Sequence, residues 1–113
     1  MMDCIFCRIV EGSLPSRKVY EDEEFLVFHD IHPFAAVHVL IIPKRHVESL
    51  QSIKESDEAM LGRLMALAPR IAASLGLESG FRTLINSGVG GGQEVFHLHA
   101  HVFGGEGSVR IPT

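Results

Sequence analysis

The stretch Phe96-His-Leu-His-Ala-His-Val-Phe103 places His97, His99 and His101 at every second position, with apolar residues between them. Successive side chains of an extended strand point to opposite faces, so this alternation predicts a strand over 96–103 with three imidazoles on one face. Imidazoles on one face suit either a metal bound by neutral ring nitrogens or a nucleophilic and acid–base cluster that acts on an anion. The alternation therefore predicts a functional site as well as a strand.

The residues just before this strand form a glycine-rich polar loop, Asn86-Ser-Gly-Val-Gly-Gly-Gly-Gln-Glu94. Backbone without side chains can approach a ligand closely, and its N–H groups can face a phosphate. On its own, such a stretch is more often a hairpin connection. Joined to three aligned histidines, it favours a site for an anion.

Length and composition predict one compact domain over residues 1–113. The chain has 113 residues, 46% of them hydrophobic, which is enough for a buried core without disulfides. The net charge of −4, with Lys and Arg scattered along the chain, argues against a nucleic acid polymer as the ligand. The chain has no apolar run of about 18 residues and no start typical of a secretion signal, so we expect no membrane association and a cytoplasmic location.

Hydrophobic periodicity predicts an α+β fold with a five-stranded antiparallel sheet, one short helix and one long helix. The predicted strands cover residues 18–21, 25–29, 37–42, 81–86 and 96–103, and the helices cover 4–11 and 56–75. Ser56 is the expected N-cap of the long helix, and Gly76 is its stop. Pro69 lies inside that helix and predicts a kink or an early end. The tail 104–113 is expected to be loosely ordered unless a partner chain fixes it.

Cys4 and Cys7 are the only cysteines and have the spacing Cys-x-x-Cys. In a reducing compartment, this spacing indicates half of a metal site or a redox pair rather than a structural disulfide. The alternative is a pair of small buried hydrophobic side chains without a metal, which is common for free cysteines.

Several segments together resemble the histidine triad family. They are His97-Leu-His-Ala-His-Val-Phe103, Phe28-His-Asp-Ile-x-Pro33, His38-x-Leu-x-Ile-Pro-Lys-x-His46, Asn86 and Gly91-Gly-Gln-Glu-Val-Phe-His97, and they follow the family's order and spacing over nearly the whole chain. The chain looks most like the compact branch that hydrolyses purine nucleoside phosphoramidates and adenylated amines. The resemblance implies the histidine triad fold and a homodimer in which two sheets join into one, with the apolar stripe of the long helix in the contact.

The resemblance also implies a mechanism that needs no catalytic cofactor. The catalytic residues it implies are His99, His101, His97 and His38. His99 attacks phosphorus, forms a nucleotidyl-histidine and is regenerated by water, which splits one hard displacement into two easier ones. His101 and Gln93 hold the phosphoryl oxygens together with the backbone of 91–94, and Asn86 helps to position them. His97 or His38 orients the partner imidazoles by hydrogen bonding.

Further residues are implied for the nucleotide, a small molecule derived from AMP or GMP. The purine slot would consist of Phe6, Ile9, Phe28 and Ile31. Aromatic residues on short elements also simply fill a core, and this alternative stays open for the slot. Asp30 would accept hydrogen bonds from ribose hydroxyls, or would cap the turn before Pro33. His29 and His32 are expected at the surface or the pocket edge.

The same resemblance extends to a metal and includes departures from the family pattern. Some members with an N-terminal Cys-x-x-Cys hold a structural zinc, and the matching ligands here are Cys4, Cys7, His46 and His97. Glu94 stands where some members carry a serine that assists the leaving group. His32 and Phe34 replace smaller or polar residues and are expected to reshape the mouth of the pocket.

Three alternatives stay open. The three alternating histidines could ligate a catalytic metal, or the chain could bind nucleotides without hydrolysing them. It could also be a dinucleoside polyphosphate (Ap4A-type) hydrolase or a nucleotidyl transferase of the same superfamily. The intact triad favours catalysis, and neither the leaving group nor the base follows from these residues.

Overall fold

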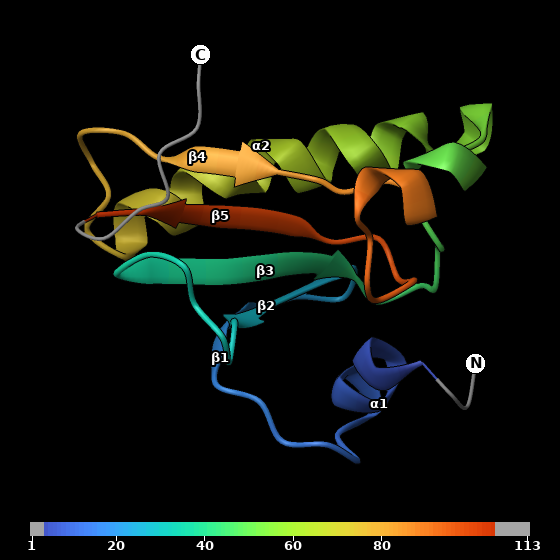
Figure 1. The fold of residues 1–113 in the computed structure, drawn as a ribbon, viewed down its shortest axis with the longest axis horizontal. Coiled ribbons are helices and arrows are strands. Elements are labelled where there is room, and N and C mark those ends of the chain that lie inside the picture. Colours follow the sequence, from blue (N-terminus) through green and yellow to red (C-terminus); the bar gives the residue numbers. More distant parts are fainter. Residues whose placement is uncertain (1–3, 106–113) are drawn as a thin grey trace.

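The computed structural model describes residues 4–105 as a five-stranded antiparallel sheet with two helices (Figure 1). The strands are β1 (Lys18–Glu21), β2 (Phe25–His29), β3 (Val37–Pro43), β4 (Arg82–Leu84) and β5 (Ala100–Gly104), in the spatial order β1-β2-β3-β5-β4. The helices are α1 (Ile5–Glu11) and α2 (Glu58–Ser74), and 3-10 turns cover Leu50–Ser52, Glu55–Asp57 and Val89–Gly91. The predicted fold class is confirmed. The prediction for the tail falls mostly on 106–113, outside the described residues.

The two faces of β2 and β3 enter separate hydrophobic clusters. One cluster joins Val27 and Ile41 to the buried face of α2, and the other joins Phe28 and Leu40 to Phe6 of α1. Strands that are buried on both faces are apolar throughout rather than alternating. The continuous apolar runs of these two strands therefore follow from a helix on each side of the sheet.

The long helix begins later than predicted. Asp57 is the N-cap residue of α2, whereas the predicted cap, Ser56, lies inside the 3-10 turn Glu55–Asp57. The Asp57 carboxylate makes no cap hydrogen bond. It pairs with Arg45 and accepts a hydrogen bond from the Lys54 N–H at 3.0 Å. These contacts hold the turn against the segment that follows β3.

Pro69 does not end α2, which continues to Ser74. Proline has no N–H, so the carbonyl four residues earlier, that of Met65, loses its helical donor. Both residues lie on the exposed face, where water can supply the missing hydrogen bond. Because the helix continues past Pro69, the predicted early end is wrong. The stop is placed as predicted, because Gly76 adopts a left-handed φ of 84° and its N–H donates to the Ala73 carbonyl at 3.1 Å.

The histidine strand is shorter than predicted. β5 begins at Ala100, so His101 lies in the strand while His97 and His99 lie in the irregular segment before it. The neighbouring strand β3 ends at Pro43, which has no N–H to donate to a longer ladder. The prediction of one strand over 96–103 is therefore wrong in its first half.

Gly88, before the 3-10 turn of the glycine-rich loop, should be the least replaceable residue of that loop. It adopts φ 76° and ψ 173°, a region that only glycine occupies readily, and a Cβ there would also have to displace the end of the exposed Gln51 side chain. We expect Gly88→Ala to lower the free energy of unfolding in urea by about 1–3 kcal/mol. Gly90→Ala is the matched control, because an added Cβ meets nothing within 4 Å and φ is not positive. Equal losses in the two variants would contradict this expectation.

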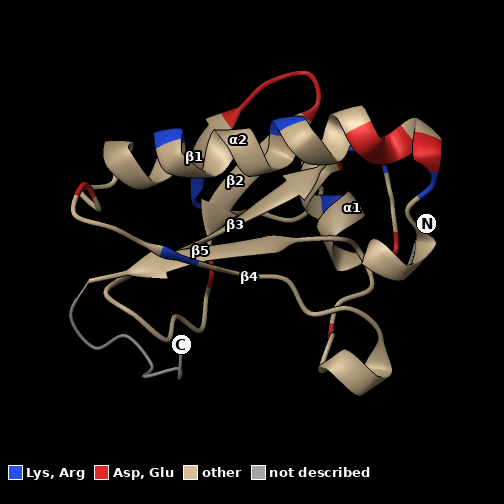
Figure 2. Ribbon diagram, turned by 90° about the horizontal axis from the view of Figure 1, so that it is seen from above, with Lys and Arg blue, Asp and Glu red and all other residues tan. Residues whose placement is uncertain are grey.

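Charged residues do not gather on one face of the described chain (Figure 2). Asp and Glu mark the start of α2 and the β1–β2 turn, while Lys and Arg lie scattered along the ribbon. A nucleic acid backbone is bound by a continuous basic surface, and the scattered Lys and Arg positions of residues 4–105 do not indicate one. Among the same residues, no helix combines the length and the apolar character needed to cross a bilayer.

Candidate active site

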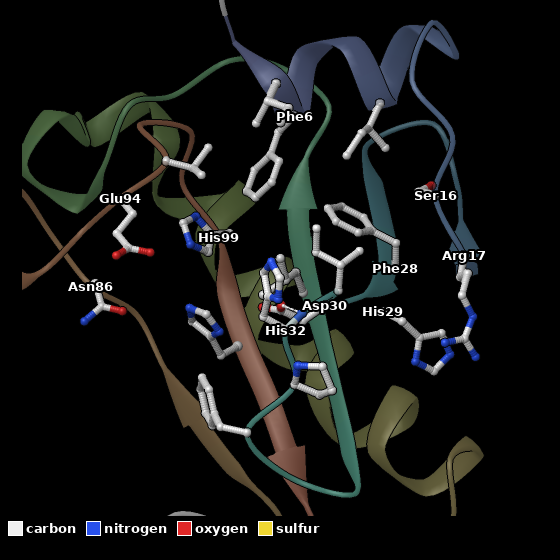
Figure 3. A pocket seen from close by; sticks show the side chains of 18 of the residues that line it. Phe6, Ser16, Arg17, Phe28, His29, Asp30, His32, Asn86, Glu94 and His99 are labelled. Atoms are coloured by element: carbon white, nitrogen blue, oxygen red, sulfur yellow. Dashed lines mark hydrogen bonds between the residues drawn. The ribbon is translucent and has the colours of Figure 1, made fainter.

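A pocket of about 910 Å³ lies between α1 and the sheet. In Figure 3, Phe6 points from α1 toward His99, with Glu94 and Asn86 on one side of the pocket and Phe28 on the other. The predicted site residues that line it are Phe6, Ile9, Phe28, Asp30, Ile31, Asn86, Glu94, His99 and His101. His38, His97 and Gln93 are buried and do not line it.

The main chain fixes the ring of His99. Its Nδ1 lies 2.7 Å from the carbonyl oxygen of His97. A carbonyl can only accept, so Nδ1 carries the proton and donates, and Nε2 keeps its lone pair. Burial lowers the pKa of His99, which keeps the ring neutral near pH 7. A fixed, neutral imidazole with a free Nε2 in a pocket has the properties of a nucleophile.

A chain of hydrogen bonds fixes the ring of His101. The Phe34 N–H donates to His38 Nδ1 at 3.3 Å, so the proton of His38 sits on Nε2. His38 Nε2 in turn donates to His101 Nδ1 at 2.8 Å. The proton of His101 therefore sits on Nε2. His101 is a hydrogen-bond donor on the pocket wall, with its ring centroid 5.1 Å from that of His99.

Burial also keeps the two imidazoles of this hydrogen-bond chain, His38 and His101, neutral. Burial lowers the pKa of His38, and it lowers the pKa of His101 to about 4 with smaller contributions from His99 and His38. The Asp30 carboxylate, whose Oδ2 lies 3.5 Å from His38 Nε2, acts in the opposite direction on both pKa values. Desolvation wins at His38 because its side chain is wholly buried.

We expect the free energy of unfolding to fall as the pH drops from 6.5 toward 4. The pKa of His101 is about 4 in the folded chain against a usual 6.5. The unfolded chain therefore binds more protons in this window, and stability is lost as the pH falls. One such imidazole contributes on the order of 2 kcal/mol, measurable by urea unfolding at about pH 7 and about pH 5. His101→Asn should reduce this pH dependence and His32→Asn, at an exposed position, should preserve it; the reverse pattern would refute the assignment.

Asp30 combines the two roles that the sequence left open. Its Oδ1 accepts the N–H of His32 at 2.8 Å, which is a turn cap. The residue also lines the pocket, and its side chain keeps 18% of its surface exposed. One carboxylate can thus fix the turn and still present an acceptor to a ligand.

Two polar side chains of the glycine-rich loop have different roles: Gln93 supports the loop, and Asn86 lines the pocket. Gln93 accepts the Gly88 N–H at 2.8 Å and donates to the carbonyls of Glu48 at 2.7 Å and Val95 at 3.0 Å. Both amide protons are used, so the side chain has no donor left for a phosphoryl oxygen and instead holds the loop in place. Asn86 donates to the Gly91 carbonyl at 2.8 Å and, unlike Gln93, lines the pocket.

The apolar slot is at once core and pocket wall. Phe6 and Phe28 meet edge to face, with ring centroids 5.5 Å apart, and both belong to the cluster under α1. Ile9 packs against the same cluster. Ile31 is different, because 85% of it is exposed at the pocket edge.

Several pocket residues were missed or undervalued by the sequence analysis. Arg17 and Ser16 line the far end of the pocket beside His29 (Figure 3). Phe34 was noted only as a departure from a family pattern, yet its ring packs against that of His38 in a tilted arrangement, with the ring centroids 4.0 Å apart. No motif marks Arg17 or Ser16. Their nearness to His29, whose N–H donates to the Arg17 carbonyl at 3.0 Å, comes from the β1–β2 pairing.

A second cluster lies at the start of α1. Cys4 Sγ is 3.3 Å from His97 Nδ1, and Cys7 Sγ is 3.3 Å from His46 Nδ1 and 3.6 Å from His97 Nδ1. His97 Nε2 donates to the Pro43 carbonyl at 2.7 Å, so Nδ1 keeps its lone pair toward the sulfurs. The four ligand atoms lie within 4.8 Å of one another.

This donor set fits a tetrahedral metal. Zinc bonds of about 2.0–2.3 Å to nitrogen and sulfur place neighbouring ligands about 3.4–3.8 Å apart, close to the spacings found between Cys7 and the two imidazoles. The imidazole of His97 is turned toward the thiols rather than toward His99 and His101. The three alternating histidines therefore do not form one metal set, and that alternative loses its geometric basis.

Fold and site together define a protein with an oriented, neutral imidazole in a pocket that joins an apolar slot to a polar glycine-rich loop. Residues 11–108 match the family model of the HIT domain, and the chain belongs to this family. Protein HitA of Neisseria gonorrhoeae is 50% identical over 104 residues, which cover 92% of this chain and 97% of that protein.

Solved structures agree with this assignment. A HIT family hydrolase from Legionella pneumophila Philadelphia 1 is 41% identical with a TM-score of 0.89, over 92% of this chain and 94% of its own. A histidine triad protein from Clostridium difficile is also 41% identical, with a TM-score of 0.91, over 100% of this chain and 96% of its own. The family predicted from the sequence is confirmed.

Proposed function

We propose that the protein hydrolyses purine nucleoside phosphoramidates and adenylated amines, breaking the P–N bond and releasing a nucleoside monophosphate. The observation that carries the proposal is the fixed, neutral His99, whose Nδ1 is held by the His97 carbonyl and whose Nε2 is free. The similarity to a HIT family hydrolase from Legionella pneumophila supports hydrolysis as the class of reaction.

In the first step, Nε2 of His99 attacks phosphorus and the P–N bond breaks. The leaving nitrogen takes a proton from solvent water at the open side of the pocket and departs as the amine. Negative charge on the phosphoryl oxygens is stabilised by the Nε2–H of His101, which the His38 hydrogen bond holds in place. The N–H groups of Gly91, Gly92 and Gln93 already donate to carbonyls of their own loop. Asn86, which lines the pocket and spends one amide proton on the Gly91 carbonyl, can supply a further donor with its second amide proton.

In the second step, water attacks the nucleotidyl-histidine and the bond between phosphorus and Nε2 breaks. The monophosphate leaves and His99 regains its lone pair. Glu94, which lines the pocket across from His99, accepts the proton of the attacking water and returns it to solvent. This assignment gives the carboxylate a role that a serine could not fill in the same way.

The nucleoside would bind along the same pocket. Phe6, Ile9 and Phe28 supply an apolar wall for the purine, and Ile31 covers it from the edge. Asp30 accepts from the ribose hydroxyls with the carboxylate surface left exposed by its turn. AMP and GMP derivatives both suit this arrangement, because the wall is apolar rather than specific for one base edge.

The test is steady-state hydrolysis of an adenosine phosphoramidate beside diadenosine tetraphosphate. Faster cleavage of the phosphoramidate supports the proposal. Cleavage of the tetraphosphate alone would assign the chain to the dinucleoside polyphosphate hydrolases, and nucleotide binding without cleavage of either would make it a binding protein.

A structural zinc is a second proposal, carried by the Cys4, Cys7, His46 and His97 cluster. When bound, zinc would tie the start of α1 to the segments after β3 and before β5. One zinc per chain in the purified protein, lost from a Cys4→Ser, Cys7→Ser variant, is the expected measurement. If the wild-type protein binds no zinc, the proposal is rejected, and Cys4 and Cys7 are small packing side chains without a metal.

A homodimer with a continuous sheet remains our proposal for the assembly. β4 is an edge strand of the described sheet, and Phe81, just before it in the chain, is 37% exposed. An edge strand next to an exposed aromatic side chain favours pairing with a second copy. Light scattering of the purified protein measures the mass directly, and a monomer would contradict the proposal.

A further inference from the structure

We propose that the metal cluster of Cys4, Cys7, His46 and His97 positions the nucleophile His99 and the purine slot, so that nucleotide affinity depends on the bound metal. The inference rests on the zinc site and the hydrolase activity proposed above. It goes beyond both, because it assigns the cluster a role in orienting the pocket residues, in addition to stabilising the fold.

The first connection between the two sites runs through His97. Its imidazole belongs to the cluster, with Nδ1 facing the thiols and Nε2 bonded to the Pro43 carbonyl. Its main-chain carbonyl, in the same residue, accepts the Nδ1–H of His99 at 2.7 Å. Whatever fixes the His97 side chain therefore also fixes the acceptor that selects the tautomer of His99.

The second connection runs through Phe6, which lies between the two cysteines on α1. Its ring meets His99 edge to face at a centroid distance of 5.1 Å and His97 at 5.9 Å. The same ring forms part of the purine slot. A displacement of α1 would therefore alter the contact with the nucleophile and the wall of the slot together.

α1 depends on such attachments for its position. It has seven residues, and an isolated helix of this length is unstable in water. Cys4 caps it by accepting the Cys7 N–H at 3.2 Å, so both cluster thiols sit in its first turn. Phe6 anchors the same turn to the sheet. A metal shared by the first turn and His97 would hold helix, slot and nucleophile in one arrangement.

The experiment compares the zinc-loaded full chain with the same chain after chelation, with metal content measured in each sample. We expect chelation to weaken AMP binding about 10-fold or more, the usual effect of losing a metal site's supporting interactions. The ¹⁵N resonances of the His99 ring, distinct for a single tautomer in the loaded chain, should move toward each other as the tautomers mix. A role in global stability alone would leave this tautomer signature unchanged in the chain that stays folded.

His46→Ala gives a second variant that keeps both cysteines and His97. It should bind zinc more weakly and should recover wild-type AMP affinity and the His99 signature as zinc is added. Glu11→Ala is the matched control on the exposed side of α1 and should keep the zinc dependence of the wild type.

Two other outcomes overturn the inference, and a third supports it while rejecting the hydrolase proposal. A chain that takes up no metal overturns it at the first step, while turnover of the phosphoramidate in the same samples still tests the hydrolase proposal. Zinc binding that leaves AMP affinity and the His99 signature unchanged shows that the two sites are independent. Zinc-dependent AMP binding without turnover supports the coupling and rejects the hydrolase.

Discussion

Replacement of His99 by alanine is expected to lower kcat for phosphoramidate hydrolysis by about 10⁴-fold or more, because the covalent route needs its Nε2. AMP affinity should change little, since the purine slot and Asp30 remain in place. Steady-state kinetics and calorimetric titration with AMP measure the two quantities on the same preparation. Retention of even a tenth of wild-type turnover would remove His99 from the role of nucleophile.

A His99→Gly variant makes the same prediction more specific. Glycine leaves a space the size of the missing ring beside Phe6, and free imidazole added to the assay can enter it and attack phosphorus. Turnover should then rise with imidazole concentration and saturate. Wild-type turnover should not respond, and a variant that fails to respond despite intact AMP binding would count against attack by an imidazole at this position.

The residue periodicities predicted the elements of this fold because burial decides them. The apolar runs at 25–29 and 37–42 reappear as strands β2 and β3, both buried on two faces. The stripe along 56–75 reappears as α2, with its start moved by the Asp57 contacts described above. Helix starts depend on individual hydrogen bonds between side chains distant in sequence, which periodicity does not register.

The histidine alternation predicted three imidazoles on one face of a strand, whereas the structure divides them between the pocket and the cysteine cluster. His99 and His101 line the pocket, whereas His97 turns its ring to the thiols and offers only its carbonyl to His99. The spacing alone could not distinguish these tasks, because the strand begins only at Ala100. The ring orientation depends on the Pro43 carbonyl, which is distant in sequence.

Gln93 is the clearest case in which composition predicted more than the geometry supports. A glutamine next to glycines looks like a phosphate ligand, yet its amide satisfies the backbone of its own loop and of Glu48. Buried amides are normally fully hydrogen-bonded. The N–H groups of Gly91 and Gly92 also donate within the loop. Asn86, with one amide proton not used on Gly91, is therefore the loop's side-chain donor on the pocket side.

His101→Ala is expected to reduce kcat by about 10²–10³-fold, because it removes a preorganised donor to the phosphoryl oxygens. His38→Ala should cost about 10-fold, since His38 does not line the pocket and acts only by orienting His101 through the 2.8 Å hydrogen bond. Single-turnover kinetics isolate the chemical step for both variants, and binding of AMP serves as the control for folding and for the purine slot.

The double variant decides whether the two histidines act as one unit. Once His101 is absent, His38 has no imidazole to orient, so His38→Ala should add little to the loss already caused by His101→Ala. The hydrogen-bond chain that starts at the Phe34 N–H predicts this strong non-additivity. Losses that multiply would mean that His38 stabilises the reacting phosphorus by a separate route. In that case His38 would act through Asp30, whose Oδ2 lies 3.5 Å from His38 Nε2.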